Sequence, residues 1–129
     1  MIVYRQQYML AQNALNVEGC LSYWSDDCVL LPPNEPAVIG KEALRSWYRN
    51  AFDDQFKSEN TITFDEIEIM DGWSFARGSY IGALIPKAGG EPIQVNGKYL
   101  EIHQQQPDGS WKFARHMWSS DNPATDVLE

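Results

Sequence analysis

The chain has 129 residues, of which 43% are hydrophobic and 12% aromatic, and its formal net charge is −8. This composition predicts one packed domain over residues 1–129 and excludes a disordered chain. The acidic charge excludes nucleic-acid and anionic-membrane partners, because phosphate binding needs a basic stripe that the ten Lys and Arg residues do not form.

The N-terminal segment MIVYRQQYML lacks the basic lead, apolar core and cleavage site of a signal peptide, and no apolar run is long enough to span a membrane. We therefore expect a cytoplasmic protein. Cys20 and Cys28 are too few for a disulfide framework and are expected to be reduced, buried thiols. Residues 119–129 are expected to form a C-terminal tail, loose from Pro123 onward.

Three helices are predicted in the first half of the chain. Apolar residues recur at helical spacing from Ile2 to Asn16, which indicates an amphipathic helix. Asn16 can cap a short second helix from Val17 to Trp24. The best-marked helix runs from Lys41 to Phe56, after Gly40.

A short strand pair is predicted between the second and third helices. Cys28 to Leu31 is an apolar run that two prolines close, which is typical of an edge strand because proline cannot donate to a ladder. Ala37 to Ile39 is expected to return beside it.

After the third helix the hydrophobic period changes from 3.6 to 2, which indicates strands. The alternation changes phase near Asp65 and Glu66, as a β-bulge would require. Asp71-Gly72 predicts a turn into a long strand from Trp73 to Pro86. The next strand is expected from Glu91 to Gln106. Asn96-Gly97 within it fits either a hairpin turn that splits the segment or a bulge, and we interpret it as a bulge.

The last two strands carry most of the residues capable of chemistry. Lys98 to Gln105 and Trp111 to Ser119 flank Pro-Asp-Gly-Ser, a strong hairpin signal. If Gln106 pairs with Trp111, Glu101 lies opposite His116 and Tyr99 lies opposite Trp118. One face then holds Tyr99, Glu101, His103, Ala114, His116 and Trp118. The opposite face holds Leu100, Ile102, Phe113, Arg115 and Met117.

The element order predicts an α+β fold, with a strongly curved antiparallel sheet wrapped around three N-terminal helices as a cone-shaped, cystatin-like roll. A sheet that bulges and glycines bend around a helix leaves a pocket between the two.

Three segments resemble the nuclear transport factor 2-like superfamily, and in particular its SnoaL-like bacterial branch. They are YWSDDCVLLPPNEPAVIGKEALRSWY, the GSY of Gly78 to Tyr80, and GKYLEIHQQQPDGSWKFARHMWSSD. The resemblance covers about Tyr8 to Asp121 and extends to the ketosteroid isomerases and the calcium/calmodulin-dependent kinase II association domain. It implies a curved sheet, a homodimer formed through that sheet, and an apolar pocket.

The resemblance assigns catalytic roles to some residues of this chain, but other roles of the family have no matching residue here. The carbonyl-polarising tyrosine of the ketosteroid isomerases corresponds to Tyr8. Their general-base aspartate falls near Pro32, which accepts no proton, and their second acidic donor falls where the chain has no carboxylate until Glu101. The acid or base that SnoaL-like cyclases carry on the last strand corresponds to His116.

His116 opposite Glu101 is the main catalytic candidate, because a carboxylate can set the tautomer and basicity of an imidazole. The alternative is a structural cross-strand pair worth under about 1 kcal/mol. His103 could join the two in a metal site, but the spacing matches no ligand motif, so no metal is expected. Candidate ligand contacts are Trp24, Trp47, Tyr80, Tyr99, His103 and Trp118, which could equally be core residues.

Three functions remain open at this point. The chain could be a cofactor-free isomerase, dehydratase or cyclase, with His116 as base, Glu101 as its orienter and Tyr8 or Tyr80 as donor to an oxyanion. It could be a non-catalytic module that binds a small apolar molecule. It could also be an assembly domain that forms dimers or rings through the sheet.

Overall fold

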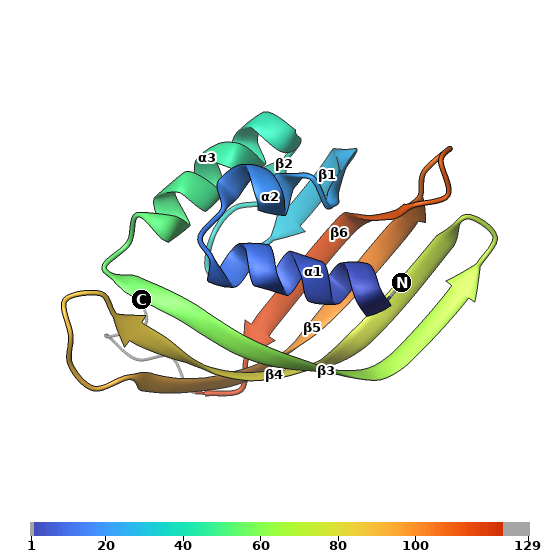
Figure 1. Cartoon of the computed structure of the whole chain (residues 1–129). Helices are drawn as coiled ribbons and strands as arrows, with labels where there is room; N and C mark the ends of the chain where they lie inside the picture. Colours follow the sequence, from blue (N-terminus) through green and yellow to red (C-terminus); the bar gives the residue numbers. More distant parts are fainter. Residues whose placement is uncertain (1, 123–129) are drawn as a thin grey trace.

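The computed structural model describes residues 2–122, in which the helices lie on one face of a curved sheet (Figure 1). The elements are α1 (Ile2–Asn13), α2 (Val17–Leu21), β1 (Trp24–Leu31), β2 (Val38–Ile39), α3 (Lys41–Phe52), β3 (Phe56–Met70), β4 (Trp73–Pro86), β5 (Ile93–Gln105) and β6 (Trp111–Ser120). The predicted α+β class and the wrapping of the sheet over the helices are confirmed.

The sheet has the strand order β2-β1-β6-β5-β4-β3 and does not close. It is mixed rather than antiparallel, because β1 runs parallel to β6. Cys28 to Leu31 is therefore not an edge strand, since β1 lies between β2 and β6. The two prolines that suggested an edge follow the last residue of β1, where they do not interrupt its ladder.

The helices are shorter than their sequence patterns indicate. Asn16 caps α2 as predicted, and its side chain accepts a hydrogen bond from the Gly19 N–H at 3.0 Å. However, α2 ends at Leu21, and Trp24 begins β1 instead of closing the helix. Sheet pairing takes over there, because the Tyr23 carbonyl accepts a hydrogen bond from Phe113 of β6 at 2.8 Å.

Of the two bulges predicted in the long strands, one is confirmed and one is wrong. The register shifts between Phe64 and Glu66, as expected. Asn96 and Gly97, by contrast, pair with β4 without a shift. Gly97 is needed there for a different reason, since a Cβ would overlap the hydroxyl of Tyr80 on the neighbouring strand.

The same arrangement occurs two pairs further along the ladder. Gly78 lies opposite Tyr99, and Tyr80 lies opposite Gly97, so each tyrosine ring covers a glycine across β4 and β5. A Cβ at Gly78 would come within 2.6 Å of the Tyr99 hydroxyl. The two glycines thus let two aromatic rings lie flat against the sheet.

The predicted register of the last hairpin is confirmed at the candidate site residues but is wrong next to the turn. Glu101 pairs with His116 and Tyr99 pairs with Trp118, as predicted. Next to the turn, Trp111 pairs with Gln105 and not with Gln106.

A bulge in β6 explains why the register is as predicted at one end of the hairpin and shifted by one residue at the other. β6 contains one more residue than β5 between the pairs His103–Phe113 and Ile102–Arg115, and this extra residue is Ala114. The bulge turns Phe113 inward, where it is fully buried, although the alternation placed it on the outer face. Ser119 and Ser120 belong to β6 rather than to a tail, and residues 123–129 lie outside the described residues.

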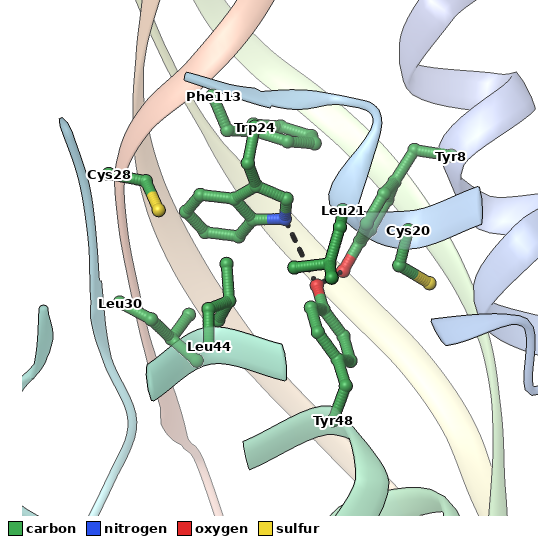
Figure 2. Close-up of a cluster of buried hydrophobic side chains, with 9 residues drawn as sticks. All are labelled: Tyr8, Cys20, Leu21, Trp24, Cys28, Leu30, Leu44, Tyr48 and Phe113. Atoms are coloured by element: carbon green, nitrogen blue, oxygen red, sulfur yellow. Dashed lines mark hydrogen bonds between the residues drawn. The ribbon is translucent and has the colours of Figure 1, made fainter. Parts of the chain in front are cut away.

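The core lies between the sheet and the helices α2 and α3 (Figure 2). Its fully buried side chains include Trp24, Leu44 and Phe113. Cys20 and Cys28 are free and buried, as predicted, and burial raises the pKa of the Cys20 thiol to about 12. Within the described residues, no helix has the length and apolarity needed to cross a membrane.

The substitution Leu44→Ala should lower the free energy of unfolding by about 2–5 kcal/mol, because it leaves a cavity in the core. Leu10→Ala is the matched control, since Leu44 is 0% exposed and Leu10 is 70% exposed. The control should change stability by less than about 0.5 kcal/mol. Urea unfolding measures both, and equal effects of the two substitutions would contradict this description of the core.

Candidate functional site

A cavity of about 810 Å³ lies between the sheet and the helices α1 and α3. This volume is within the range of small-molecule sites, roughly 300–1,000 Å³. Its wall is mainly aromatic and aliphatic, and its polar members include Arg5, Tyr8 and His116. The cavity thus combines an apolar body with a few fixed polar groups.

His116 projects from β6 into the cavity wall, with 13% of its side chain exposed. Aromatic rings surround it, and the ring centroids of Trp24, Tyr99 and Trp118 lie 6.2, 6.2 and 5.6 Å away. Burial lowers the pKa of His116 to about 4, against the opposing influence of Glu101. The imidazole is therefore neutral at physiological pH and can accept a proton.

Glu101 lies behind His116 and is fully buried. Its Oε1 accepts a hydrogen bond from Arg5 Nε at 2.8 Å and forms an ion pair with Arg5 Nη2 at 2.7 Å. Its Oε2 is 2.7 Å from His103 Nε2. Burial raises the pKa of Glu101, but Arg5 and the hydrogen bond from His103 more than offset this, and the net shift is downward. The carboxylate is therefore ionised, and His103 Nε2–H is the donor to it.

The predicted opposition of Glu101 and His116 is present, but the two are not hydrogen-bonded. His116 Nδ1 lies 3.7 Å from Glu101 Oε1, which is too long for a hydrogen bond. Glu101 acts on His116 through its charge, which raises the pKa of the imidazole. Its hydrogen bonds go to Arg5 and His103 instead.

Tyr8 lines the cavity from α1, and its hydroxyl is hydrogen-bonded to the hydroxyl of Tyr48 on α3 (Figure 2). Trp24 Nε1 donates to the same Tyr48 oxygen at 3.1 Å. Burial raises the pKa of both hydroxyls, so both keep their protons at neutral pH. The two hydroxyls carry two protons and only one of these lies in the O–H···O bond between them, so the other O–H is not used in that bond. Because Trp24 donates to Tyr48, cooperativity favours Tyr48 donating to Tyr8 and leaves the Tyr8 proton free.

The remaining predicted contact residues differ in what they offer. Trp47 and Trp118 form an edge-to-face pair in the cavity wall, with ring centroids 5.9 Å apart. Tyr80 and Tyr99 also line the cavity, but their hydroxyls donate to the carbonyls of Ser119 and Thr63, respectively. The hydroxyl of Tyr80, the second oxyanion donor that the sequence allowed, is thus already engaged by the Ser119 carbonyl.

His103, a predicted ligand contact, is buried outside the described lining of the cavity, and its Nε2 is hydrogen-bonded to Glu101. Within the described residues, no group of three His, Cys, Asp or Glu side chains is arranged to hold a metal ion. A second, more open hollow of about 520 Å³ lies at the Gly72 and Pro107 turns, and its lining contains no aromatic or basic side chain.

Sequence reasoning missed Arg5 and Tyr48, which complete the polar side of the site. Arg5 is a charged residue within the first predicted helix, yet it is only 3% exposed. Its position three residues before Tyr8 places it on the same helix face, and this was the available signal. A carboxylate on the concave face of the sheet also requires a cation nearby.

The family model of the SnoaL-like domain matches residues 5–116. The protein belongs to the SnoaL-like domain family. This assignment agrees with the predicted resemblance and with the ketosteroid isomerase-like, nuclear transport factor 2-like fold of the chain.

Solved structures similar to this SnoaL-like domain carry names of several kinds. A ketosteroid isomerase-like protein from Erwinia carotovora atroseptica is 26% identical, with a TM-score of 0.82 and coverage of 92% of each chain. A candidate calcium/calmodulin-dependent protein kinase II association domain from Xanthomonas campestris is 18% identical, with a TM-score of 0.82, covering 95% of this chain and 86% of that one.

A hexachlorocyclohexane dehydrochlorinase LinA-type3 from Novosphingobium barchaimii is 15% identical to this SnoaL-like domain, with a TM-score of 0.77, covering 92% of this chain and 82% of that one. At identities of 18% and 15%, the latter two structures show a shared fold alone. No curated protein sequence matches the chain.

The stability of this SnoaL-like domain should fall as the pH is lowered from about 6.5 to about 4. The folded-state pKa of His116, about 4, is below the ordinary 6.5, so the unfolded chain binds the extra proton in this window. The loss from His116 alone should be at most about 3 kcal/mol. The pKa of Glu101 is also lowered in the folded state, so its protonation should reduce stability further at lower pH. Urea unfolding across this range measures the effect.

The variant His116→Asn, which cannot take up the proton, is the control for this pH dependence. Arg5, Glu101 and His103 face the imidazole and remain in place in that variant. It should show a shallower fall in stability over the same pH range. An unchanged slope would mean that His116 is not the group responsible.

Proposed function

We propose that this protein binds a small apolar carbonyl compound and transfers a proton at the carbon next to the carbonyl. The reaction would be of the isomerase or lyase type and would use no cofactor. The observation that carries the proposal is a neutral His116 in the wall of an aromatic cavity that also contains a free tyrosine O–H. The names isomerase-like and dehydrochlorinase among the similar structures support the same class of chemistry.

His116 is the proposed general base. Its Nδ1 is the ring nitrogen near the Glu101 carboxylate, which favours the tautomer with the proton on Nδ1 and leaves the Nε2 lone pair for the substrate. When Nε2 removes the proton, the imidazolium forms beside an ionised Glu101, whose charge stabilises it. The same Nε2–H can then return the proton to a different carbon or to a leaving group.

Tyr8 is the proposed donor to the oxygen on which negative charge develops. Its hydroxyl belongs to the chain of donors that runs from Trp24 through Tyr48. Each donor in such a chain polarises the next, so the terminal O–H is a stronger donor than an isolated phenol.

His116→Gln should slow exchange of the methyl protons of methyl β-naphthyl ketone with deuterated water by about 100-fold or more, because the base is removed. Tyr8→Phe should slow it by about 10-fold to 100-fold through loss of the donor. Proton NMR of the ketone measures the exchange. Lys112→Gln, on the same strand but outside the cavity wall, is the control and should keep the full rate.

Two results of that experiment would change the conclusion. If the His116→Gln variant exchanges at the wild-type rate, His116 is not the base. If the ketone binds to the wild-type protein but never exchanges its protons, the protein is a binding module without catalysis.

We also propose that the protein forms a homodimer through the outer face of its sheet. Leu31, Met117 and Leu100 pair side by side across β1, β6 and β5. Their exposed fractions are 37%, 47% and 47%, respectively. This row of exposed apolar side chains continues into Arg77 and Glu66, which form an ion pair at 2.9 Å. An apolar row that ends in charged groups is typical of an interface between subunits.

Met117→Glu should convert a dimer into a monomer, because it places a charge in the middle of the apolar row. Light scattering coupled to size-exclusion chromatography measures the mass. Leu10→Glu is the matched control, since Leu10 is exposed on α1 rather than on the sheet. A wild-type protein that runs as a monomer at all concentrations would contradict this proposal.

A further inference from the structure

The Arg5 guanidinium has one nitrogen that makes no hydrogen bond within the described part of the chain. Nε donates to Glu101 Oε1 at 2.8 Å and Nη2 forms an ion pair with the same oxygen at 2.7 Å, but the buried Nη1 has no hydrogen-bond partner among the described residues. Arg5 is 3% exposed and forms part of the cavity wall. An unmet donor on a buried charged group costs free energy that an incoming acceptor can recover.

Three aromatic rings and one carboxylate fix the position of this guanidinium. The ring centroids of Tyr8, Phe113 and Tyr99 lie 5.2, 5.2 and 5.7 Å from Arg5 Cζ. Such contacts hold a planar guanidinium in one orientation. The free Nη1 is therefore a preorganised donor, and a ligand that binds to it does not have to order a flexible side chain.

The charges around Arg5 indicate what kind of acceptor fits. Glu101 already neutralises the guanidinium. His116 is neutral, and the described residues of the cavity wall include no Lys or Arg other than Arg5 and a single carboxyl group, that of Asp54. A ligand carboxylate would find no uncompensated positive charge and would lose its hydration. A neutral carbonyl oxygen can accept from Nη1 without that cost.

We infer that Arg5 Nη1 is the group that recognises a neutral carbonyl oxygen of the ligand, and that the cavity selects ketones over both hydrocarbons and carboxylic acids of the same shape. The inference rests on the proposed function for the location and carbonyl class of the ligand, and it adds the residue that recognises the oxygen and the exclusion of carboxylic acids. Arg5 would hold the same oxygen that Tyr8 polarises, so the carbonyl would have two donors from α1.

Three isosteric probes test the inference by binding alone, measured by equilibrium dialysis. They are methyl β-naphthyl ketone, β-isopropylnaphthalene and β-naphthoate, which share the naphthalene ring and differ in the group attached to it. The wild-type protein should bind the ketone at least about tenfold more tightly than either of the other two, which corresponds to one good hydrogen bond.

Two variants assign that preference to Arg5. Arg5→Lys keeps a positive charge beside Glu101 but loses the second guanidinium nitrogen, so the ketone preference should fall to about twofold or less. The double variant Arg5→Met with Glu101→Gln removes both charges together and should give the same result. The affinity for β-isopropylnaphthalene should stay within about threefold in both, which reports an intact cavity. Arg49→Lys, the same change at an exposed position of α3, should leave the preference unaltered.

The outcomes separate this inference from the proposed function. Equal binding of ketone and hydrocarbon by the wild-type protein, a preference retained in Arg5→Lys, or tighter binding of β-naphthoate would each overturn the inference. Ketone selectivity that depends on Arg5, with no proton exchange, would sustain the inference and refute catalysis. Exchange that depends on His116, in a protein without ketone selectivity, would refute the inference and sustain the proposed catalysis.

Discussion

The ion pair between Arg5 and Glu101 is the interaction on which the polar side of the molecule depends. Glu101 occupies an inward position of a central strand, where a lone carboxylate would be driven to its neutral form. Arg5 reaches it from the first helix, 96 residues away in sequence, and fixes that helix against the concave face. Such a pair contributes little net stability after its desolvation cost, but it specifies one arrangement of the groups around it.

The remaining groups of the site follow from this pair. His103 completes the hydrogen bonds of the carboxylate, and His116 lies at the edge of the same charge cluster, where burial keeps it neutral. Arg5 lies against the ring of Tyr8, which in turn contacts Tyr48. His116, the Tyr8 hydroxyl and the Arg5 guanidinium are therefore held by one connected network that spans α1, α3 and the sheet.

The elements that could be predicted from the sequence were those with a local signal. The Asp-Gly turn and the alternation around it correctly predicted that Glu101 lies opposite His116. The predicted pairing beside the turn was wrong by one residue, but the bulge at Ala114 cancels that error further along the hairpin. The same bulge reversed the side on which Phe113 lies. Period and turn chemistry predict a ladder, but they do not reveal a compensating insertion in one strand.

Features that depend on distant segments were not predictable in the same way. The parallel pairing of β1 with β6 joins two strands that are far apart in the sequence. Nothing in the local sequence of Cys28 to Leu31 indicates this pairing. The burial of Arg5 depends on a carboxylate at the far end of the sequence. The bond between Tyr8 and Tyr48 likewise joins two helices whose patterns indicate packing alone. The glycines of β4 and β5 have a consequence of their own, because the tyrosine rings that cover Gly78 and Gly97 also line the cavity. A side chain at either position would collide with a backbone carbonyl of the adjacent strand and with the tyrosine ring. Replacing either glycine would therefore displace a ring from the cavity wall and change the shape of the cavity as well as that of the sheet.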